Sequence, residues 1–362
     1  MNKQTQITLT ILVLSLLIQN CNEPNNIKES PPTWESLGLE GKHIKRLRLF
    51  KPYLYACAVS DGLWRKDIQT ENSEWEYLGF SNTSAGQSLI YGVVDVVVHP
   101  ENPDEILVAV FPDSVAAHGI FKSEDGGFSW FVSDSGMGVY LPEPYDDIFY
   151  IENPTLFLQT PDKLLAAGGS LAQSTDFGQT WNLTDPIVGQ SSAVWTYSLT
   201  YHKENTHVLW LGASSMFGYS ILLHSLDNCI NWDYISLDSV VEINNMVYSI
   251  ALDPSDADIA YVSVFYDIIK TTDGGASWTI IYSLEEQNGQ IRSVVEDGVQ
   301  SGHLFTAVEN NVMETNDGGN TWTDLESPNG SDAFTMVYDS DEGVLYIGTE
   351  NGSAPSGVFV YK

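Results

Sequence analysis

One eight-residue pattern, S/T-x-D-x-G-x-x-W, recurs along this chain at nearly constant spacing. A worn copy at residues 225–232 keeps the aspartate and the tryptophan but has Cys229 in place of glycine. The four clear copies are residues 123–130, 174–181, 271–278 and 315–322. The five aspartates are separated by 51, 51, 46 and 44 residues, which is close to the period of four-stranded propeller blades. The pattern therefore predicts a repeat architecture before any other residue is considered.

The tryptophans extend the repeat from five copies to seven. Trp75 follows a segment, residues 62–67, that matches the strand before the first box, and Trp34 lies in a segment that matches the strand after the last box. The C-terminal residues 357–362 match a strand that precedes a box. We therefore predict an all-β fold, a seven-bladed β-propeller of four-stranded antiparallel blades, whose ring is closed by pairing the N- and C-terminal strands. Residues 33–362 would form this single domain, with about 47 residues per blade.

The residue types within each box suit a tight hairpin. Serine or threonine and aspartate can bond backbone N–H groups around a turn, and glycine adopts the positive φ that other residues resist. The tryptophan can bury a large apolar face between strands or blades. Because the aspartates recur once per blade, they cannot converge on one active site, and we interpret the boxes as structural; in the worn copy, Cys229 predicts a distorted turn. The structural set is Ser123, Asp125, Gly127, Trp130, Ser174, Asp176, Gly178, Trp181, Asp227, Trp232, Thr271, Asp273, Gly275, Trp278, Thr315, Asp317, Gly319 and Trp322.

The repeated box resembles that of the Asp-box, or BNR-repeat, propeller family, over essentially the whole chain after residue 32. The resemblance implies a fold more than an activity, since such proteins include sialidases, xyloglucanase-type glycoside hydrolases, sortilin-like receptors and photosystem assembly factors. Sialidases in this family hold the substrate carboxylate with three arginines. This chain has four arginines: Arg46, Arg48, Arg65 and Arg292. Arg46 and Arg48 lie in one run, Arg65 lies on a blade's third strand, and the (F/Y)RIP motif is absent. We therefore expect no sialidase activity.

The first 32 residues have the composition of a leader followed by a tether. Lys3 precedes an apolar stretch, residues 7–18, that is too short to span a bilayer, so residues 1–20 predict a signal peptide. The sequence LIQNC resembles a bacterial lipobox, which implies acylation of Cys21, although Asn20 stands where a small residue is usual. Residues 21–32 then predict a polar tether. The expected location is the bacterial cell envelope, as a periplasmic or cell-surface lipoprotein; the alternative is ordinary secretion after cleavage nearby.

Charge and residue spacing exclude several classes of function. The chain has 48 acidic and 15 basic side chains and a formal charge of −33, so nucleic acid and anionic membranes should repel it. We interpret this charge as a solubilising surface. Cys57 and Cys229 fall in blades one and four, too far apart for a disulfide. We find no zinc-ligand spacing, no D-x-D-x-D calcium loop and no nucleophile motif, and therefore predict no metal and no cofactor.

Loops on the face opposite the boxes carry the candidate ligand-binding residues. Several are long and contain aromatic and carboxylate side chains, which suit sugars or peptides because rings stack on apolar faces and carboxylates accept from hydroxyls or amines. The alternative is that the aromatic rings merely pack the loops. The candidates are Tyr145, Asp146, Asp147, Trp195, Tyr197, Phe217, Asn245, Tyr266, Arg292 and Glu309.

The sequence thus favours a non-catalytic binding or scaffold propeller, exported as a lipid-anchored monomer, that recognises a glycan or protein ligand. Two alternatives stay open: a glycoside hydrolase that uses acidic residues in the propeller funnel, and an assembly factor for an envelope protein complex. We identify no catalytic residue, because 48 acidic side chains make any single pair uninformative. A hydrolase would need two carboxylates about 5 to 9.5 Å apart in an open pocket.

Overall fold

The computed structural model describes Thr33 and most of the compact unit Trp34–Lys362; residues 1–32, and with them Cys21, lie outside the described residues. The described residues are 33–59, 61–81, 92–111, 119–137, 155–160, 163–168, 171–184, 194–215, 220–237, 240–241, 246–284, 289–308, 310–350 and 356–362. Over these ranges the chain forms 28 strands and one 3-10 turn, η1 (Pro328–Gly330), and it contains no helix long and apolar enough to cross a membrane.

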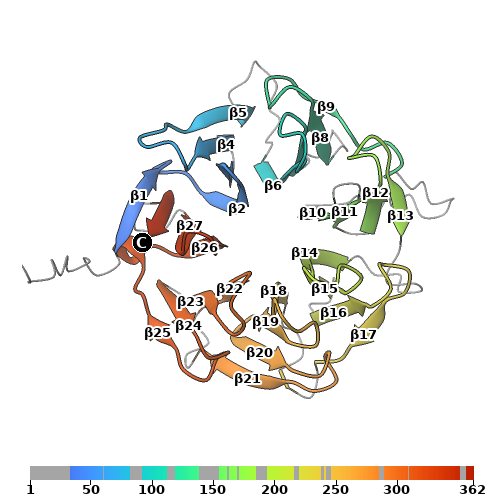
Figure 1. Cartoon of the computed structure of the whole chain (residues 1–362), viewed down its shortest axis with the longest axis vertical. Coiled ribbons are helices and arrows are strands. Elements are labelled where there is room, and N and C mark those ends of the chain that lie inside the picture. Colours follow the sequence, from blue (N-terminus) through green and yellow to red (C-terminus); the bar gives the residue numbers. More distant parts are fainter. Residues whose placement is uncertain are drawn as a thin grey trace, which may run out of the picture. The chain divides into compact units, whose positions relative to one another are not determined.

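The strands form seven four-stranded antiparallel sheets, arranged as blades around a central axis (Figure 1). This confirms the fold that the spacing of the boxes predicts. The inner strands, nearest the axis, are β2 (Ile44–Phe50), β6 (Gly92–Val98), β10 (Thr155–Thr160), β14 (Val194–Tyr201), β18 (Val247–Leu252), β22 (Ile291–Glu296) and β26 (Ala333–Asp339). The second strands are β3 (Tyr53–Ala58), β7 (Ile106–Phe111), β11 (Lys163–Ala167), β15 (Leu209–Ser215), β19 (Ala260–Val264), β23 (Leu304–Val308) and β27 (Val344–Thr349).

The outer half of each blade carries the box. The third strands are β4 (Asp61–Asp67), β8 (Ile120–Ser123), β12 (Leu171–Ser174), β16 (Ser220–Ser225), β20 (Asp267–Thr271), β24 (Asn311–Thr315) and β28 (Val358–Tyr361). The outer strands are β5 (Glu76–Ser81), β9 (Phe131–Val132), β13 (Asn182–Thr184), β17 (Asp233–Ile235), β21 (Thr279–Ser283), β25 (Thr323–Asp324) and β1 (Trp34–Gly38). Because the strands alternate in direction, the box hairpins lie on the same face as the carboxyl ends of the inner strands.

The two ends of the chain complete one blade. The N-terminal strand β1 pairs with the C-terminal strand β28, with Trp34 opposite Tyr361, so blade seven is built from both termini. This confirms the predicted ring closure. The indole Nε1 of Trp34 also donates to the carbonyl of Leu325 in blade six, 3.1 Å away.

The outer-strand tryptophans join neighbouring blades by the same type of bond. Trp75, Trp130, Trp181 and Trp322 each donate from Nε1 to a backbone carbonyl of the preceding blade, at 2.8 to 3.2 Å. Trp278 instead donates to Gly275 within its own box. The repeated tryptophan therefore links blades as well as burying apolar surface.

Each box is a turn held by its serine or threonine and its aspartate. In the first copy, Ser123 Oγ accepts from the N–H of Gly127 at 2.8 Å, and Asp125 accepts from the N–H of Ser129 at 2.8 Å. The same bonds recur in the other four copies. These bonds explain why the pattern repeats in every copy without any shared active site.

The worn copy keeps this turn, so the predicted distortion is wrong. Cys229 adopts the left-handed φ of +69° that glycine has elsewhere, and its N–H donates to Ser225 Oγ at 2.9 Å. Its small side chain is buried in an apolar cluster formed by residues of blades three and four. The side chain of cysteine is compact enough to accept the strained backbone without opening the hairpin.

Candidate functional site

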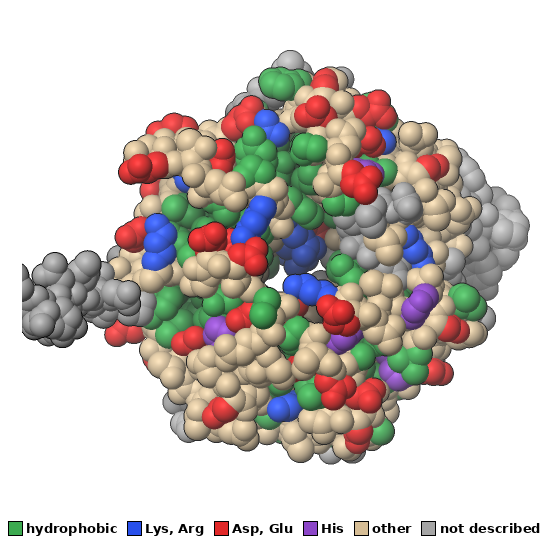
Figure 2. Space-filling view, viewed as in Figure 1, with side chains coloured by type: hydrophobic (Ala, Val, Ile, Leu, Met, Phe, Trp, Pro, Cys, Tyr) green, Lys and Arg blue, Asp and Glu red, His purple; other side chains and the backbone are tan. Residues whose placement is uncertain are grey.

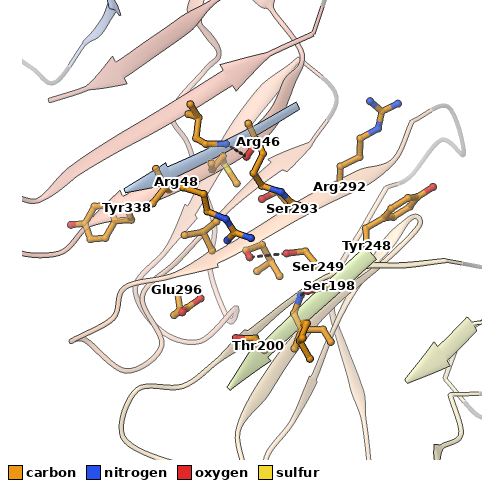
Figure 3. A pocket seen from close by; sticks show the side chains of 18 of the residues that line it. Arg46, Arg48, Ser198, Thr200, Tyr248, Ser249, Arg292, Ser293, Glu296 and Tyr338 are labelled. Atoms are coloured by element: carbon orange, nitrogen blue, oxygen red, sulfur yellow. Dashed lines mark hydrogen bonds between the residues drawn. The ribbon is translucent and has the colours of Figure 1, made fainter. Parts of the chain in front are cut away.

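A cavity of about 350 Å³ follows the axis of the ring, between the inner strands (Figure 3). Strand β22 lines it with five consecutive residues, from Arg292 to Glu296, so the cavity extends along nearly the whole strand. At about 3.3 Å per residue, this corresponds to a depth of about 13 Å. We call this cavity the channel; its box-side end lies near the carboxyl ends of the inner strands, and its loop-side end lies opposite.

A β-bulge near the start of most inner strands shapes the loop-side end. The register shifts across residue 45 in β2, 248 in β18, 292 in β22 and 334 in β26. A bulge leaves one residue unpaired and redirects its side chain. The redirected residues are Lys45, Tyr248, Arg292 and Phe334, and the last three line the channel. Figure 3 shows Tyr248 and Arg292 together at one end of the cavity, with Glu296 at the other.

The register also shifts before Asp95 in β6 and before Ser198 in β14, as it does before Thr335 in β26. The residues that follow these three bulges hold the inner strands to one another. Asp95, Ser198 and Thr335 each accept a backbone N–H from the next blade, at 3.1 Å: those of Leu156, Ile250 and Leu47. The edge of an inner strand otherwise exposes unpaired N–H groups to the channel. This polar belt therefore stabilises the wall of the channel at the level just below the bulges.

In blade two the belt residue is a carboxylate, Asp95, and blade one supplies its counter-charge. The guanidinium of Arg48 binds Asp95 through two bonds of 2.8 and 2.7 Å, and Asp95 is completely buried. Burial lowers the pKa of Arg48, but the charge of Asp95 and its hydrogen bond outweigh burial and raise it. The Nε of Arg46 lies 3.9 Å from the same carboxylate and has no hydrogen bond to any described residue. Burial accordingly lowers the pKa of Arg46, and Asp95 only partly opposes this effect.

Phe334 organises the cations at the loop-side end. The centroid of its ring lies 4.6 Å from Lys45 Nζ and 4.8 Å from Arg292 Cζ. Arg292 also donates to Glu350 at 2.5 Å. Burial, together with the neighbouring charges of Arg46 and Arg292, lowers the pKa of Lys45 to about 8, while Glu350 acts in the opposite direction. We call Lys45, Arg46 and Arg292 the loop-side cations.

The box-side end has a different chemistry. Glu296 ends β22 there, and burial raises the pKa of its carboxyl to about 7, against the opposing charge of Lys203. A Cβ added at Gly298 would lie 2.1 Å from Lys203 Nζ, so this side chain reaches from blade four to blade six. Lys203 thus lies across the box-side mouth.

The sign of charge in the channel is opposite to that of the chain as a whole. The chain has about three acidic side chains for each basic one. Four cations and one carboxylate line the described part of the channel: Arg46, Arg48, Lys203, Arg292 and Glu296. Figure 2 shows basic side chains around the central hollow, with acidic side chains spread over the surrounding surface. The channel therefore concentrates positive charge in a strongly acidic protein.

The structure places the predicted ligand-binding residues unevenly. Arg292 lines the channel, and Tyr266 lies between β19 and β20 against Phe265, which in turn stacks on the channel residue Tyr248. Two further candidates, Trp195 and Tyr197, were expected in a loop, but they lie on strand β14. The remaining candidates lie outside the described residues: Tyr145, Asp146, Asp147, Phe217, Asn245 and Glu309.

Sequence reasoning missed the inner-strand cations, although a signal for them was present. Aligning the inner strands on their bulges would place Lys45 beside Arg292 and Phe334, and would show that Arg46 and Arg48 interrupt an otherwise small or apolar series. Polar residues on a strand next to the axis must face the channel or a neighbouring blade.

The described lining limits the chemistry of this site. Glu296 is its single carboxylate, so the described part of the channel lacks the carboxylate pair of a glycoside hydrolase. Within the same ranges, no group of three or more His, Cys, Asp or Glu residues could hold a metal ion. What the geometry provides is a narrow cationic cavity flanked by aromatic rings, which suits binding.

No protein-family model matches the sequence, and no curated protein matches it either. Solved structures match the fold. YCF48 from Cyanidioschyzon merolae is 13% identical with a TM-score of 0.60, covering 91% of this chain and 98% of that chain. A GH74 enzyme from Niastella koreensis is 18% identical with a TM-score of 0.64, covering 91% and 53%. The extracellular domain of BT4673, a hybrid two-component system of B. thetaiotaomicron, is 14% identical with a TM-score of 0.62, covering 91% and 39%. These likenesses establish the class, a seven-bladed β-propeller, and this chain spans about half or less of the last two proteins.

Proposed function

We propose that this protein is a non-catalytic binding or scaffold propeller of the Asp-box type, and that it recognises a glycan or protein ligand at the loop-side end of the channel. The observation that carries the proposal is the lining of that channel. Aromatic rings and cations meet there, while the described lining has a single carboxylate, Glu296. Such a site can hold a ligand by shape and charge but lacks the two carboxylates of a hydrolase.

The structural neighbours support a binding role by analogy. A second structure of the same neighbour contains YCF48 bound to a D1 peptide, at 12% identity to this chain. The BT4673 neighbour is a sensor's extracellular domain. A propeller of this shape can therefore serve as a recognition module without chemistry, including one that assists assembly of an envelope complex.

A ligand array tests this proposal directly. The full-length protein in detergent is applied to glycan, polysaccharide and envelope-protein arrays, and bound ligands are then incubated with it to detect turnover. Binding without turnover is the expected result. Turnover of any ligand would contradict the non-catalytic assignment, and a protein that binds nothing on any array would contradict recognition.

Glu296 is the one observation that favours a glycoside hydrolase as a second candidate. Its pKa of about 7 is suited to a general acid, and it lines the channel. Reducing-end release from xyloglucan, abolished by Glu296→Gln, would support the hydrolase; equal background release by both proteins would eliminate it.

We also propose that residues 1–20 direct export and that Cys21 is acylated, so that the propeller is held at a membrane through a tether. Acyl chains contribute about 0.8 kcal/mol per buried CH₂, enough for several chains to anchor an acidic protein. Labelling of cells with an alkyne fatty acid should tag the wild type and not Cys21→Ala. Label that persists in the variant would place the lipid elsewhere.

A further inference from the structure

The geometry points to a binding site for one oxyanion group, a carboxylate or a phosphate, at the loop-side end of the channel, with the Arg46 guanidinium as its anchor. The inference rests on the proposed function only for the larger ligand that would carry this group. The site itself can also be filled by a free small anion, and the experiment below distinguishes the two sources.

Arg46 is the anchor because Asp95 compensates its charge only partly, from 3.9 Å and without a hydrogen bond. Within the described ranges, the carboxylate that neighbours it is Asp95, which is 3.9 Å from Nε and is already bound by Arg48 through two shorter bonds. Asp95 further accepts the N–H groups of Leu156 and Val96. The Nε–H of Arg46 is buried and has no hydrogen bond to any described residue. The side chain as a whole is 27% exposed and lines the cavity, so an anion in the channel would pair with that exposed part and not with the buried N–H.

The other two channel arginines do not form a three-arginine clamp with Arg46. Arg48 is bound to Asp95, and Arg292 is bound to Glu350 at 2.5 Å. The site therefore differs from one in which several free guanidinium groups converge on one carboxylate. It offers one uncommitted guanidinium, with further cations close enough to contribute charge.

Lys45 is the second cation of this site. It has no ion pair with any described residue, and it shares the ring of Phe334 with Arg292. Since both cationic groups lie within 5 Å of one ring centroid, they lie within about 9 Å of each other and repel. An anion bound beside them would relieve this repulsion. Holding the loop-side cations close together costs electrostatic free energy in the empty site, and ligand binding would recover it.

The size and position of the channel strengthen the attraction. A cavity of about 350 Å³ admits a small anion or the charged end of a larger ligand. Charges interact more strongly in a narrow cavity surrounded by protein than at an open surface, because less water screens them. The acidic outer surface repels extended polyanions, so the site selects a single anionic group rather than a highly charged polymer.

Fluorine NMR with matched probes tests the site on the full-length protein in detergent. Trifluoroacetate supplies an oxyanion, and trifluoroacetamide is its neutral analogue of nearly the same shape. We expect the trifluoroacetate resonance to broaden and shift with wild-type protein, inorganic phosphate to reverse this effect, and trifluoroacetamide to remain unaffected. Equal effects on both fluorinated probes would overturn the proposal.

Variants assign the binding to named residues. Arg46→Gln should weaken trifluoroacetate binding at least tenfold, and Lys45→Gln several-fold. Lys362→Gln removes the same charge from an exposed residue on the rim of the ring and should leave binding unchanged. If Arg46→Gln does not fold, Arg46→Lys and Lys45→Gln provide the test. Wild-type affinity in the Arg46 and Lys45 variants would place the anion elsewhere and overturn the inference.

The outcomes separate this inference from the proposed function. If an arrayed ligand binds but trifluoroacetate does not, the oxyanion site is wrong and the proposed function stands. If trifluoroacetate binds through Arg46 while every array is silent, the site is a receptor for free small anions and the proposed function is wrong. If Arg46→Gln loses both, one ligand group occupies the site that we infer.

Discussion

His303 is the residue whose charge the fold constrains most directly. It is buried between two carboxylates, with Nδ1 2.8 Å from Asp297 and Nε2 2.9 Å from Glu314. Its ring packs against Phe305 and Tyr338. Burial lowers the pKa of His303, but the hydrogen bonds and charges of Glu314 and Asp297 outweigh burial and raise it above its ordinary value. The folded protein therefore favours the cationic imidazole more strongly than the unfolded chain does.

We predict that His303→Gln destabilises the protein more at pH 6 than at pH 9. Because the pKa of His303 is raised in the folded state, its contribution is complete below about pH 6.5 and is lost as the pH rises through the folded value. At pH 6 the loss should be about 3 kcal/mol, since two largely buried carboxylates lose their cation. Urea unfolding of the wild type and the variant at both pH values measures this. His207→Gln, at an exposed site, is the control, and a pH-independent difference would contradict the ion-pair assignment.

A second prediction concerns Lys45 and the pH dependence of anion binding. Burial, with Arg46 and Arg292, lowers the pKa of Lys45 to about 8, while Glu350 acts in the opposite direction. His43 and Phe334 also lie near this group. Trifluoroacetate should bind tightly below pH 8 and several-fold more weakly at pH 9.5, where the amine is neutral. In Lys45→Gln the decrease over this range should disappear; an unchanged decrease would assign it to another group.

These residues also show where sequence reasoning at this scale ends. Arg292 could be assigned to the loop-side face from its position at the start of a blade. Arg46 and Arg48 were visible as one basic run, but their different states depend on Asp95, which approaches from another blade. Sequence distance gives no indication that one carboxylate hydrogen-bonds one of two neighbouring arginines and lies 3.9 Å from the other without a hydrogen bond.

At the scale of the element, the box hairpin in blade six disfavours a side chain at Gly319 for two separate reasons. Gly319 has a φ of +90°, and a Cβ added there would lie 2.5 Å from Ile281 Cδ1 of the preceding blade. The backbone conformation and the contact between blades therefore both oppose a side chain at this position. Gly330 is a natural comparison, because its φ is +69° but an added Cβ would meet nothing within 4 Å.

We predict that Gly319→Ala lowers the free energy of unfolding by about 2 to 4 kcal/mol, from the left-handed backbone and the overpacked contact together. Gly330→Ala should cost about 1 kcal/mol, from the backbone alone. Urea denaturation of both variants gives the difference. Equal losses would show that the contact with Ile281 relaxes and that only the backbone conformation matters.

The elements divide into those that the sequence could predict and those that it could not. The boxes and the strands around them follow from local chemistry, since serine, aspartate and glycine act within eight residues. The bulges at Lys45, Tyr248 and Arg292 were not predicted, because an extra residue in a strand leaves no distinctive residue type. The polar belt was missed for the same reason: Asp95, Ser198 and Thr335 matter only when neighbouring blades meet.

On the scale of the whole molecule, the ring has two distinct aspects: its number of blades follows from the sequence repeats, and its charges are distributed unevenly between the channel and the surface. Periodic spacing was sufficient to predict seven blades and the pairing of β1 with β28, since each terminus carries part of one blade. Periodicity does not describe the axis, where six of the seven blades contribute different residues to the described lining of the channel. There the channel cations lie inside a shell with a large excess of carboxylates. The carboxylates of this shell repel one another, and they are largely exposed to solvent.

That self-repulsion predicts how salt acts on stability. With a formal charge of −33, the folded chain should gain stability when salt screens repulsion between distant surface carboxylates, with a Debye length of about 10 Å at 0.1 M. The melting temperature should rise by about 2 °C or more between about 10 and 200 mM sodium chloride. A variant in which four exposed carboxylates are neutralised, Glu71→Gln, Glu74→Gln, Glu101→Gln and Glu204→Gln, should melt higher at low salt and respond less to added salt. Calorimetry of both proteins over this range is the measurement, and a melting temperature that falls with salt would show that surface ion pairs outweigh the repulsion.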